Sequence, residues 1–492
     1  MNPVKLILFT VSIFYSLTVF NQQSFELVES TQESEAFVYT FEDFSKNYIS
    51  IGARNTEFGA DSTSPIIAKY DASGNIIKIK ELYKFDTTFS FKYGLQKKNG
   101  NYLILGTLSD IVTPKDNNVT YLCELSSILE IIWEKMYPIP TAYIHHALVD
   151  FLIGPDSNII VYGKADSSQY SSDDLIYTAL FSMDGEKLDF RFYNDWRDFG
   201  VYNEMIFKPD SSGFYIIGDI NKNYQPKDWL EIDNNLNIVS FGNIENNLSY
   251  LHSPLSSKWL SDGNMIIANL SSGITVPSYQ DLEVRIVDPQ FNLVRDTIIY
   301  YPNEHVYIPV NKGLDFDDEN LIWVATFEAE YLFLPGTEVF NFHIFDSNLN
   351  LKGVKQYGGD RRYWFYALMV TSDGGCLLTG MVPDNDGSYN LDAYIIKVMP
   401  EDILTLSEET LYAFDKDVLV FPNPFSTEIN CQTVRKDLTF NLFDMAGKFI
   451  LSEEIDPIPN FSTPTGFINA GFYFYIIEND GRIIQSGKLL KK

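Results

Sequence analysis

A motif of one turn, four apolar residues and one small residue recurs seven times between residues 47 and 380. The small residues that close the motif are called anchor residues below, and successive anchors lie 54, 57, 55, 50, 57 and 55 positions apart. Such even spacing indicates a repeat architecture, in which each copy is one supersecondary unit. The anchor residues are Gly52, Gly106, Gly163, Gly218, Ala268, Ala325 and Gly380.

Each repeat contains further strand signals on both sides of its anchor. About twenty residues later a strand runs through a turn into another strand, as in residues 68–76, 179–188 and 342–351. Apolar stretches such as 147–153 and 365–371 precede the anchors. The pattern predicts four strands and two tight turns per repeat, with Asn, Asp and Gly supplying the positive φ angles of the turns.

Four antiparallel strands per repeat are typical of a β-propeller blade. We therefore predict an all-β chain with a seven-bladed β-propeller over residues 23–402, in which the anchors are small because packed blades approach closely. Separate β-sandwiches are the alternative, but they would have longer units with Greek-key crossovers. Closure needs a fourth strand for the last blade, and either 25–29 or 403–406 could supply it. The predicted blade boundaries lie near residues 85, 140, 197, 248, 302 and 359.

Composition excludes several classes of partner. The chain has 36 Lys and Arg against 66 Asp and Glu, a formal charge of -30, which repels nucleic acid and anionic lipid. Its three cysteines, Cys123, Cys376 and Cys431, are far apart and odd in number. They indicate neither a zinc site nor a disulfide framework, so burial of the core must stabilise the fold.

The first residues predict a secretory signal peptide over 1–22. Lys5 precedes an apolar run from Leu6 to Phe20, which polar residues then end. The run is too short for a membrane span but suits a signal peptide; a buried strand or helix is the alternative. No lipidation cysteine follows, and we expect removal before about Gln23 and no transmembrane segment in the mature chain.

The repeat ends after Pro400, and a different module follows a linker at 403–417. Residues 418–492 alternate apolar runs with turn residues, which predicts a small β-sandwich of about seven strands. Short motifs mark its beginning, middle and end. Their main residues are Pro422, Asn423, Pro424, Asp444, Gly447, Gly471 and Tyr473.

This module resembles the type A C-terminal sorting domain of the Bacteroidetes type IX secretion system. The motifs occur in the family's order, although Phe421 replaces the commoner Tyr. The resemblance implies export by the type IX secretion machinery to the medium or the cell surface. It also implies removal of the domain when the protein is released or joined to surface lipopolysaccharide. An ordinary terminal sandwich is the alternative.

Signatures of catalysis are missing from the sequence. It has no nucleophile elbow, phosphate-binding loop, HExxH motif or EF-hand. The acidic stretch 315–319 could bind calcium, but a solvated turn explains it better. We therefore predict no cofactor and consider a binding protein better supported than an enzyme.

Five residues occupy similar positions when the repeats are aligned, 16 to 20 residues before their anchors. We expect them to surround the central channel on one face, where the innermost strands begin. They could bind a carboxylate, a sulfate, a sugar or a metal, or they could be ordinary rim residues. Asp150 and Glu204 are the candidate carboxylates nearby, and His343 should lie elsewhere on a third strand. The predicted rim residues are His146, Tyr202, His252, His305 and Arg362.

Two functions fit these observations. The first is a secreted or cell-surface propeller that binds a glycan, a protein or matrix. The alternative is a secreted enzyme that degrades polysaccharide or peptide, with its active site on the propeller rim. Paired carboxylates or clustered histidines around one pocket would distinguish the two.

Overall fold

The chain folds almost entirely into β-strands in the computed structural model, which describes most residues from Ser24 onward. α1 (Pro400–Leu404) is the one helix among these residues, and no described helix has the length and apolarity to cross a membrane. The described residues are 24–29, 34–55, 63–82, 87–110, 119–138, 145–154, 156–166, 174–198, 203–223, 225–244, 254–272, 280–299, 305–307, 312–329, 339–358, 361–383, 390–404, 419–421, 425–432, 438–444, 447–455, 461–479 and 482–492.

Seven antiparallel units form the larger part of the fold, and each unit is one predicted blade. Within a blade the first strand pairs with the second, the second with the third, and the third with the fourth. The second strand of every blade carries the anchor residue, as the repeat predicts. Blade 1 consists of β2 (Ser34–Glu42), β3 (Tyr48–Asn55), β4 (Thr63–Tyr70) and β5 (Ile76–Glu81), and blade 2 of β6 (Thr87–Gln96), β7 (Tyr102–Asp110), β8 (Val119–Leu125) and β9 (Ile131–Pro138). Blade 3 consists of β10 (His145–Ile153), β11 (Ile159–Asp166), β12 (Asp174–Phe181) and β13 (Lys187–Asp198), and blade 4 of β14 (Glu204–Phe207), β15 (Gly213–Lys222), β16 (Gln225–Asp233) and β17 (Ile238–Gly242).

The remaining blades follow the same plan with one variation. The first strand of blade 6 is split into two segments, and both pair with β24. Five of the six predicted blade boundaries fall between strands, and the sixth falls at the end of β13. Blade 5 consists of β18 (Pro254–Trp259), β19 (Met265–Ser272), β20 (Gln280–Val287) and β21 (Leu293–Ile299). Blade 6 consists of β22 (His305–Tyr307) with β23 (Leu314–Asp315), β24 (Ile322–Ala329), β25 (Val339–Phe345) and β26 (Leu351–Gly358). Blade 7 consists of β27 (Trp364–Val370), β28 (Cys376–Pro383), β29 (Leu391–Val398) and β1 (Phe25–Glu29).

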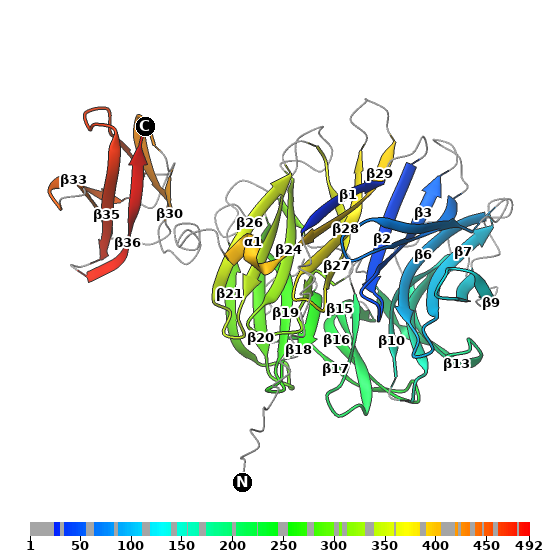
Figure 1. The fold of residues 1–492 in the computed structure, drawn as a ribbon. Helices are drawn as coiled ribbons and strands as arrows, with labels where there is room; N and C mark the ends of the chain where they lie inside the picture. Colours follow the sequence, from blue (N-terminus) through cyan, green and yellow to red (C-terminus); the bar gives the residue numbers. More distant parts are fainter. Residues whose placement is uncertain are drawn as a thin grey trace, which may run out of the picture.

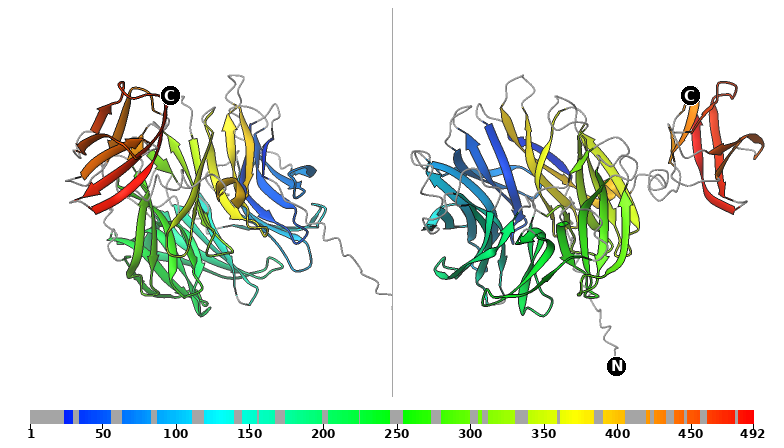
Figure 2. Two further views of the ribbon diagram at one scale, coloured as in Figure 1. Left: turned by 60° about the vertical axis from the view of Figure 1, so that its left-hand side comes forward. Right: turned by 180° about the vertical axis from the view of Figure 1, so that it is seen from behind.

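The first strands of the blades form a ring. Each contacts the first strand of the next blade, in the order β2, β6, β10, β14, β18, β23 and β27, and β27 contacts β2 again. Figures 1 and 2 show the blades arranged around a common centre, with colours that run from blue through green to yellow. The predicted seven-bladed propeller is thus confirmed as the fold of this region.

The last blade takes its fourth strand from the start of the described chain. β1 pairs with β29 along its whole length, from Phe25 opposite Lys397 to Glu29 opposite Ala393, and Figure 1 shows this dark blue strand among the gold ones. The alternative, 403–406, is excluded because its first two residues belong to α1. Ile403 is buried in the core of the last blades, so the folded propeller extends past the predicted boundary at 402.

Two anchors, Gly52 and Gly380, are glycine because the first strand of their own blade bulges toward them. In blade 1 the extra residue of the bulge is Val38, close to the pairing with Gly52. A β-carbon on Gly52 would lie 1.8 Å from the carbonyl oxygen of Ala36. A β-carbon on Gly380 would similarly lie 2.0 Å from the carbonyl oxygen of Trp364. These close contacts lie within one blade, and not between packed blades as the sequence suggested.

The turns between third and fourth strands differ from the prediction in one respect. Asp and Asn close four of these turns, and Ser and Glu close the turns of blades 2 and 3. In blade 1, Asp71 accepts hydrogen bonds from the main-chain N–H groups of Ser73 and Asn75, both at 2.9 Å. The left-handed position is a glycine in two blades, but in four it is a buried apolar residue. That conformation costs about 1–2 kcal/mol, which burial of such a side chain, about 1.5–3 kcal/mol, offsets. The four residues are Leu129 (φ 63°), Leu236 (φ 61°), Phe291 (φ 63°) and Leu349 (φ 61°).

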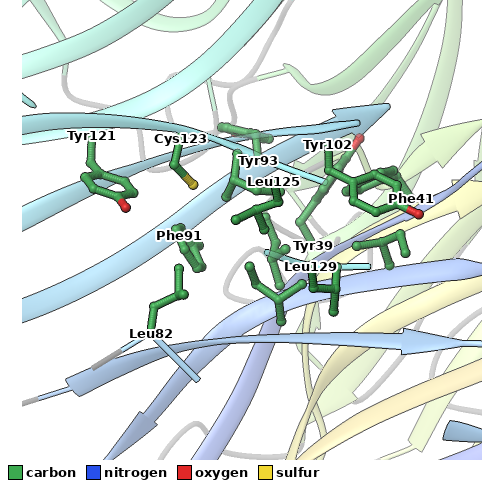
Figure 3. Close-up of a cluster of buried hydrophobic side chains, with 14 of the residues drawn as sticks. Tyr39, Phe41, Leu82, Phe91, Tyr93, Tyr102, Tyr121, Cys123, Leu125 and Leu129 are labelled. Atoms are coloured by element: carbon green, nitrogen blue, oxygen red, sulfur yellow. The ribbon is translucent and has the colours of Figure 1, made fainter. Parts of the chain in front are cut away.

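Apolar side chains fill the spaces between neighbouring blades. Figure 3 shows the cluster between blades 1 and 2, in which Tyr39 meets Tyr93 edge to face with 5.6 Å between ring centroids. Cys123 belongs to this cluster, and Cys376 and Cys431 are buried elsewhere. All three cysteines are free, so packing and not disulfide bonding holds these regions together.

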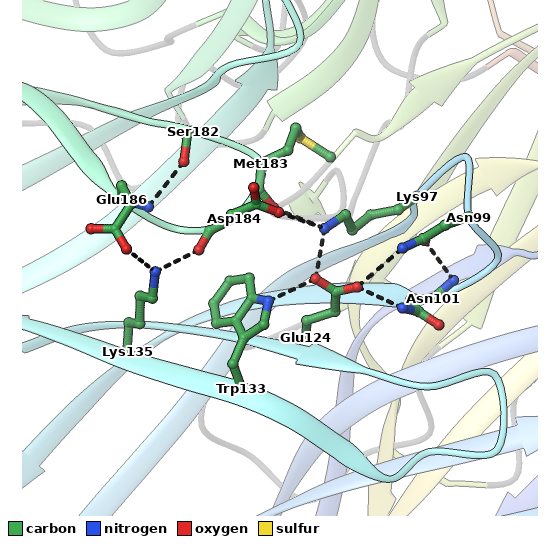
Figure 4. Close-up of polar contacts among 10 residues, drawn as sticks. All are labelled: Lys97, Asn99, Asn101, Glu124, Trp133, Lys135, Ser182, Met183, Asp184 and Glu186. Carbon is green, nitrogen blue, oxygen red and sulfur yellow. Dashed lines mark hydrogen bonds and ion pairs between the residues drawn. The ribbon is translucent and has the colours of Figure 1, made fainter.

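A buried ion pair also lies at a contact between blades. In the contact between blades 2 and 3, Lys97 Nζ lies 2.6 Å from Glu124 Oε2 and donates to the carbonyl oxygen of Met183 at 2.9 Å (Figure 4). Glu124 also accepts a hydrogen bond from Trp133 Nε1 at 2.7 Å. A charge that leaves water must recover its hydrogen bonds inside the protein, and both partners do so here.

The C-terminal module is a small sandwich of seven described strands, as predicted. One sheet has the order β30-β31-β34 and the other β33-β32-β35-β36. Side chains from both sheets, including Ile429 and Phe440, meet in one core. No described strand of this module pairs with a described strand of the propeller. The strands are β30 (Leu419–Phe421), β31 (Glu428–Gln432), β32 (Leu438–Asp444), β33 (Phe449–Ile455), β34 (Phe461–Pro464), β35 (Gly471–Asn479) and β36 (Arg482–Lys491).

Candidate functional site

Four consecutive blades place a tyrosine or a carboxyl group at the same level of the central ring. Each of these residues lies on a first strand and pairs with the residue just before the anchor. Because the first strands contact one another around the ring, these residues lie on neighbouring strands at its centre. A lysine from the segment before β23, Lys312, interacts electrostatically with Tyr39, Asp150 and Glu204. We define the axial cluster as Tyr39, Tyr93, Asp150, Glu204 and Lys312.

Asp150 is buried and connects blade 3 to blade 4. Its Oδ2 accepts a hydrogen bond from the main-chain N–H of Met205 at 2.6 Å, and its Oδ1 accepts one from that of Phe151 at 2.8 Å. Burial raises the pKa of Asp150 to about 6, although the charge of Lys312 and both hydrogen bonds oppose the rise. Asp150 therefore changes its charge near neutral pH, unlike an ordinary aspartate.

Glu204 connects blade 4 to blade 5 in the same way. Its Oε2 accepts hydrogen bonds from the main-chain N–H of Ser257 at 2.6 Å and from the Ser257 hydroxyl at 3.2 Å. No described residue hydrogen-bonds to its other oxygen, Oε1, and the side chain is partly exposed. Burial, followed by the charge of Asp150, raises the pKa of Glu204 to about 8. The carboxyl group is thus mostly protonated at neutral pH and retains one oxygen for a ligand.

Lys312 supplies the positive charge of the axial cluster. Tyr39 has the largest effect on the pKa of Lys312 and raises it above its ordinary value, against the effect of burial. Asp150, Glu204 and Asp315 add to this rise. Among the described residues, no carboxylate lies within ion-pair distance of its ammonium group. Lys312 therefore has no direct carboxylate partner among the described residues, which leaves its hydrogen-bond donors available for a ligand.

The raised pKa of Glu204 predicts a specific pH dependence of stability. The folded state holds the Glu204 proton more tightly than the unfolded state, so this proton stabilises the folded protein. The stabilisation is complete below the unfolded pKa of 4.5 and is lost as the pH rises through about 8. Glu204→Gln should weaken this loss of stability, because glutamine does not titrate. Each tenfold difference in proton affinity between the folded and unfolded states contributes about 1.4 kcal/mol to the free energy of unfolding. Urea denaturation at both ends of that pH window measures the effect.

The matched control for this prediction is Glu401→Gln, which changes an exposed carboxyl group on α1. It should keep the pH dependence of the wild-type protein. If Glu204→Gln also keeps it, the pKa of Glu204 is not raised in the folded state.

The structure describes the predicted rim residues only in part. Tyr202 and His252 lie outside the described residues, and so do the side chains of His146 and His305. In the main chain, His146 lies at the start of β10 and His305 at the start of β22, so both lie on first strands. Arg362 lies just before β27. The convergence of these five side chains on one funnel therefore stays a prediction.

Two of the side chains considered in the sequence have clear surroundings. The guanidinium of Arg362 lies 4.3 Å from the ring centroid of Trp364, a cation–π contact. His343 lies on β25, a third strand, as predicted, and its Nδ1 is 3.2 Å from the carbonyl oxygen of Val324. Burial lowers the pKa of His343 to about 4, so it is a neutral core residue.

The acidic stretch 315–319 makes its contacts with protein groups. Asp315 Oδ1 lies 2.7 Å from Lys258 Nζ, and its Oδ2 accepts a hydrogen bond from the main-chain N–H of Val370 at 2.9 Å. In the described part of the chain, no group of three or more His, Cys, Asp or Glu residues is arranged to hold a metal ion.

Tyr39, Tyr93 and Lys312 were not identified from the sequence, although the repeat carries a signal for them. Each lies 13 positions before its anchor, Asp150 does so as well, and Glu204 lies 14 before its own. Comparing the residues at this position of the aligned repeats would have found the cluster. The search for histidines led instead to positions further upstream.

The C-terminal motif residues have clear structural roles where they are described. Pro422, Asn423 and Pro424 lie outside the described residues. The main-chain N–H of Gly447 donates to the carbonyl oxygen of Asp444 at 2.9 Å, and Gly447 has a φ of 78°, which favours glycine. The Asp-x-x-Gly pattern is thus a tight turn. At the end of the module, Tyr473 is buried on β35 and follows Gly471.

Comparison with protein families identifies this module. Residues 419–492 match the family described as secretion system C-terminal sorting domain. This segment is a type IX sorting domain. The protein is therefore a secreted or cell-surface protein, handled by the type IX secretion machinery, as predicted. A comparison with curated protein sequences found no match.

Similarity to solved structures is low. An extracellular domain assigned to a hybrid two-component system of B. thetaiotaomicron is 10% identical, with a TM-score of 0.45, and the match covers 94% of this chain and 56% of that one. A Dyadobacter fermentans protein of unknown function is 9% identical, with a TM-score of 0.42 and coverages of 76% and 98%. An ulvan lyase is 10% identical, with a TM-score of 0.40 and coverages of 59% and 76%. At these scores, none of them indicates what this chain binds.

Proposed function

We propose that the propeller of this secreted protein is a binding module for a glycan, a protein or matrix, and that its ligand contacts the axial cluster. The observation that supports this most is the Lys312 ammonium, which pairs with no described carboxylate although it interacts electrostatically with ionisable side chains from three other blades. Ligand sites often occur where residues with shifted pKa values converge. A propeller ring brings such residues together from distant parts of the chain.

The chemistry of the axial cluster suits a polar ligand. Lys312 offers three N–H donors, and the protonated Glu204 has an oxygen free of contacts with described residues. Tyr39 makes no hydrogen bond to a described residue, and burial raises the pKa of its hydroxyl, which stays neutral. These groups could hold the hydroxyl or acid groups of a sugar or a peptide.

One observation favours the alternative, a secreted enzyme that degrades polysaccharide or peptide. Asp150 and Glu204 are neighbouring carboxyl groups whose pKa values are raised to about 6 and about 8. Carboxyl pairs with separate pKa values are typical of general acid–base catalysis. However, each group already uses an oxygen to accept a main-chain N–H of the next blade. We therefore place binding first.

A glycan array, a matrix-protein panel and a polysaccharide-degradation screen test this proposal. We expect Lys312→Met to weaken binding of any ligand found about tenfold, or about 1.4 kcal/mol. Lys98→Met, which changes an exposed lysine, should bind like the wild type. If Lys312→Met binds as well as the wild type, the ligand does not reach the axial cluster. Degradation of a polymer that is lost in Glu204→Gln would instead favour the enzyme.

A further inference from the structure

The sheet β33-β32-β35-β36 of the sorting domain (Figure 1) carries exposed aromatic side chains on its outward face. On β35, the buried residues Tyr473 and Tyr475 alternate with Phe472 and Phe474. Successive side chains of a strand point to opposite faces, so both phenylalanines point away from the core of the sandwich. Phe472 is 56% exposed and Phe474 is 38% exposed.

The register of the sheet places further apolar side chains beside these two rings. Phe443 of β32 pairs with Phe474 on one side and with Phe449 of β33 on the other. The rings of Phe443 and Phe449 meet edge to face with 5.8 Å between centroids, and Phe449 is 53% exposed. Phe472 pairs with Leu490 of β36. Directly paired residues have Cβ atoms about 4.5–5.5 Å apart, so these side chains form one continuous surface. We define the aromatic patch as Phe443, Phe449, Phe472, Phe474 and Leu490.

Two motifs of the sorting domain lie beside the aromatic patch. The tight turn from Asp444 to Gly447 joins β32 to β33, directly between Phe443 and Phe449. Gly471, from the second motif, is the first residue of β35 and precedes Phe472. The motif residues therefore shape the main chain that presents the patch.

Charged side chains divide this face of the sheet into two ends. Lys448 and Lys488 are exposed, and they lie next to residues of the aromatic patch in the sequence and in the sheet register, respectively. At the other end, the carboxylates of Glu454 and Glu478 belong to residues that both pair with Thr439. The patch is thus an aromatic centre with positive charge at its margin. Aromatic centres with polar rims are typical of protein-binding surfaces.

We propose that the aromatic patch is the surface by which a protein of the type IX secretion machinery binds this chain. The machinery handles the chain through this domain, and clustered exposed apolar side chains usually mark an interaction site. The partner should present an apolar cleft with acidic groups at its edge, which complement the two lysines. The inference depends on the identity of the sorting domain and not on the ligand proposed for the propeller.

Export of the full-length protein in a bacterium with a type IX system tests the proposal. The double substitution Phe472→Thr and Phe474→Thr removes two rings and keeps residues that favour strands. We expect the amount at the surface and in the medium to fall several-fold or more, with accumulation in the periplasm, because aromatic residues contribute most to binding. The urea midpoint should change little, since both positions are exposed.

Matched variants separate loss of binding from a general effect of substitution. Phe44→Thr changes a phenylalanine that is 67% exposed on the propeller, and its export should equal that of the wild type. Lys448→Glu should reduce export by opposing the charge of the partner, whereas Glu454→Gln, at the other end of the face, should not. Wild-type export of the double variant overturns the proposal. If the double variant does not fold, Lys448→Glu and the crosslinking below decide the question.

Photo-crosslinking in living cells identifies what covers the aromatic patch. The photoreactive amino acid p-benzoylphenylalanine replaces Phe474 in the full-length chain, and the same replacement of Phe44 is the control. A light-dependent crosslink from position 474 to a protein of the secretion machinery, absent from position 44, supports the proposal. A crosslink to a second copy of this chain, or to its own propeller, overturns it, because the patch would then be an interface of the protein with itself.

Discussion

Deletion of β1, Phe25–Glu29, should unfold the propeller or lower its stability severely. Without it, β29 loses the hydrogen bonds along its outer edge and blade 7 has only three strands. Phe25 also packs on Tyr48 of blade 1, with 5.9 Å between ring centroids, and lies against Gly74. Burying an apolar side chain contributes about 1.5–3 kcal/mol and each hydrogen bond about 1 kcal/mol. The total loss is about 5 kcal/mol or more, comparable with the whole stability of many domains.

Two adjacent substitutions in β1 provide a matched pair for this test. Leu27 packs into the core between blades 7 and 1, whereas Val28 is 40% exposed. Leu27→Asp should therefore lower the urea midpoint strongly, and Val28→Asp should change it little. A deletion variant with the wild-type midpoint would show that β1 does not close the ring in solution.

The seven blades could be predicted from the sequence because their cause is local and repeated. In blades 1 and 7 the anchor stands where a bulged first strand leaves no room for a side chain, as the contacts of Gly52 with Ala36 and of Gly380 with Trp364 show. Such a requirement leaves a small residue at the same place in these repeats. The closing strand has no local signal of this kind, because β1 pairs with a strand about 370 residues away. Short apolar segments at both ends of the repeat region were equally suitable.

The buried residues in the turns show a second limit of sequence analysis. A positive φ favours glycine or asparagine, and this preference alone does not predict Leu236 or Phe291 at such a position. Packing decides there: Phe291 stacks on Trp229 with 4.7 Å between ring centroids. Where glycine occupies the turn instead, a neighbouring aromatic ring fills the space, as Trp133 does beside Gly185.

The axial cluster could be predicted only in part. Asp150 and Glu204 were candidates because carboxyl groups near a channel are chemically conspicuous, and the structure places them on neighbouring first strands. Their raised pKa values depend on burial, which the sequence does not reveal. Lys312 lies 13 positions before its anchor, as Tyr39, Tyr93 and Asp150 do, but the residue type at this position differs from blade to blade, so no repeated motif marks it.

Deletion of residues 418–492 should abolish export without unfolding the propeller. The sorting domain has its own core, and none of its described strands pairs with the propeller. Since the type IX machinery handles the protein through this domain, the truncated chain should remain in the periplasm. Cell fractionation measures where it accumulates, and its urea midpoint should equal that of the full-length propeller.

The reciprocal experiment separates loss of the signal from loss of folding. Residues 405–492, which contain the linker and the sorting domain, are fused behind a signal peptide and a carrier protein that is normally periplasmic. This carrier should now reach the medium or the cell surface, because the signal lies in a module none of whose described strands pairs with the propeller. Asp444→Ala removes the acceptor of the Lys448 main-chain N–H, at 2.9 Å, and so loosens the motif turn. Export of the fusion should then fall while the carrier stays folded. If the truncated propeller still reaches the surface, or unfolds, sorting and binding are not divided between the two parts as inferred here.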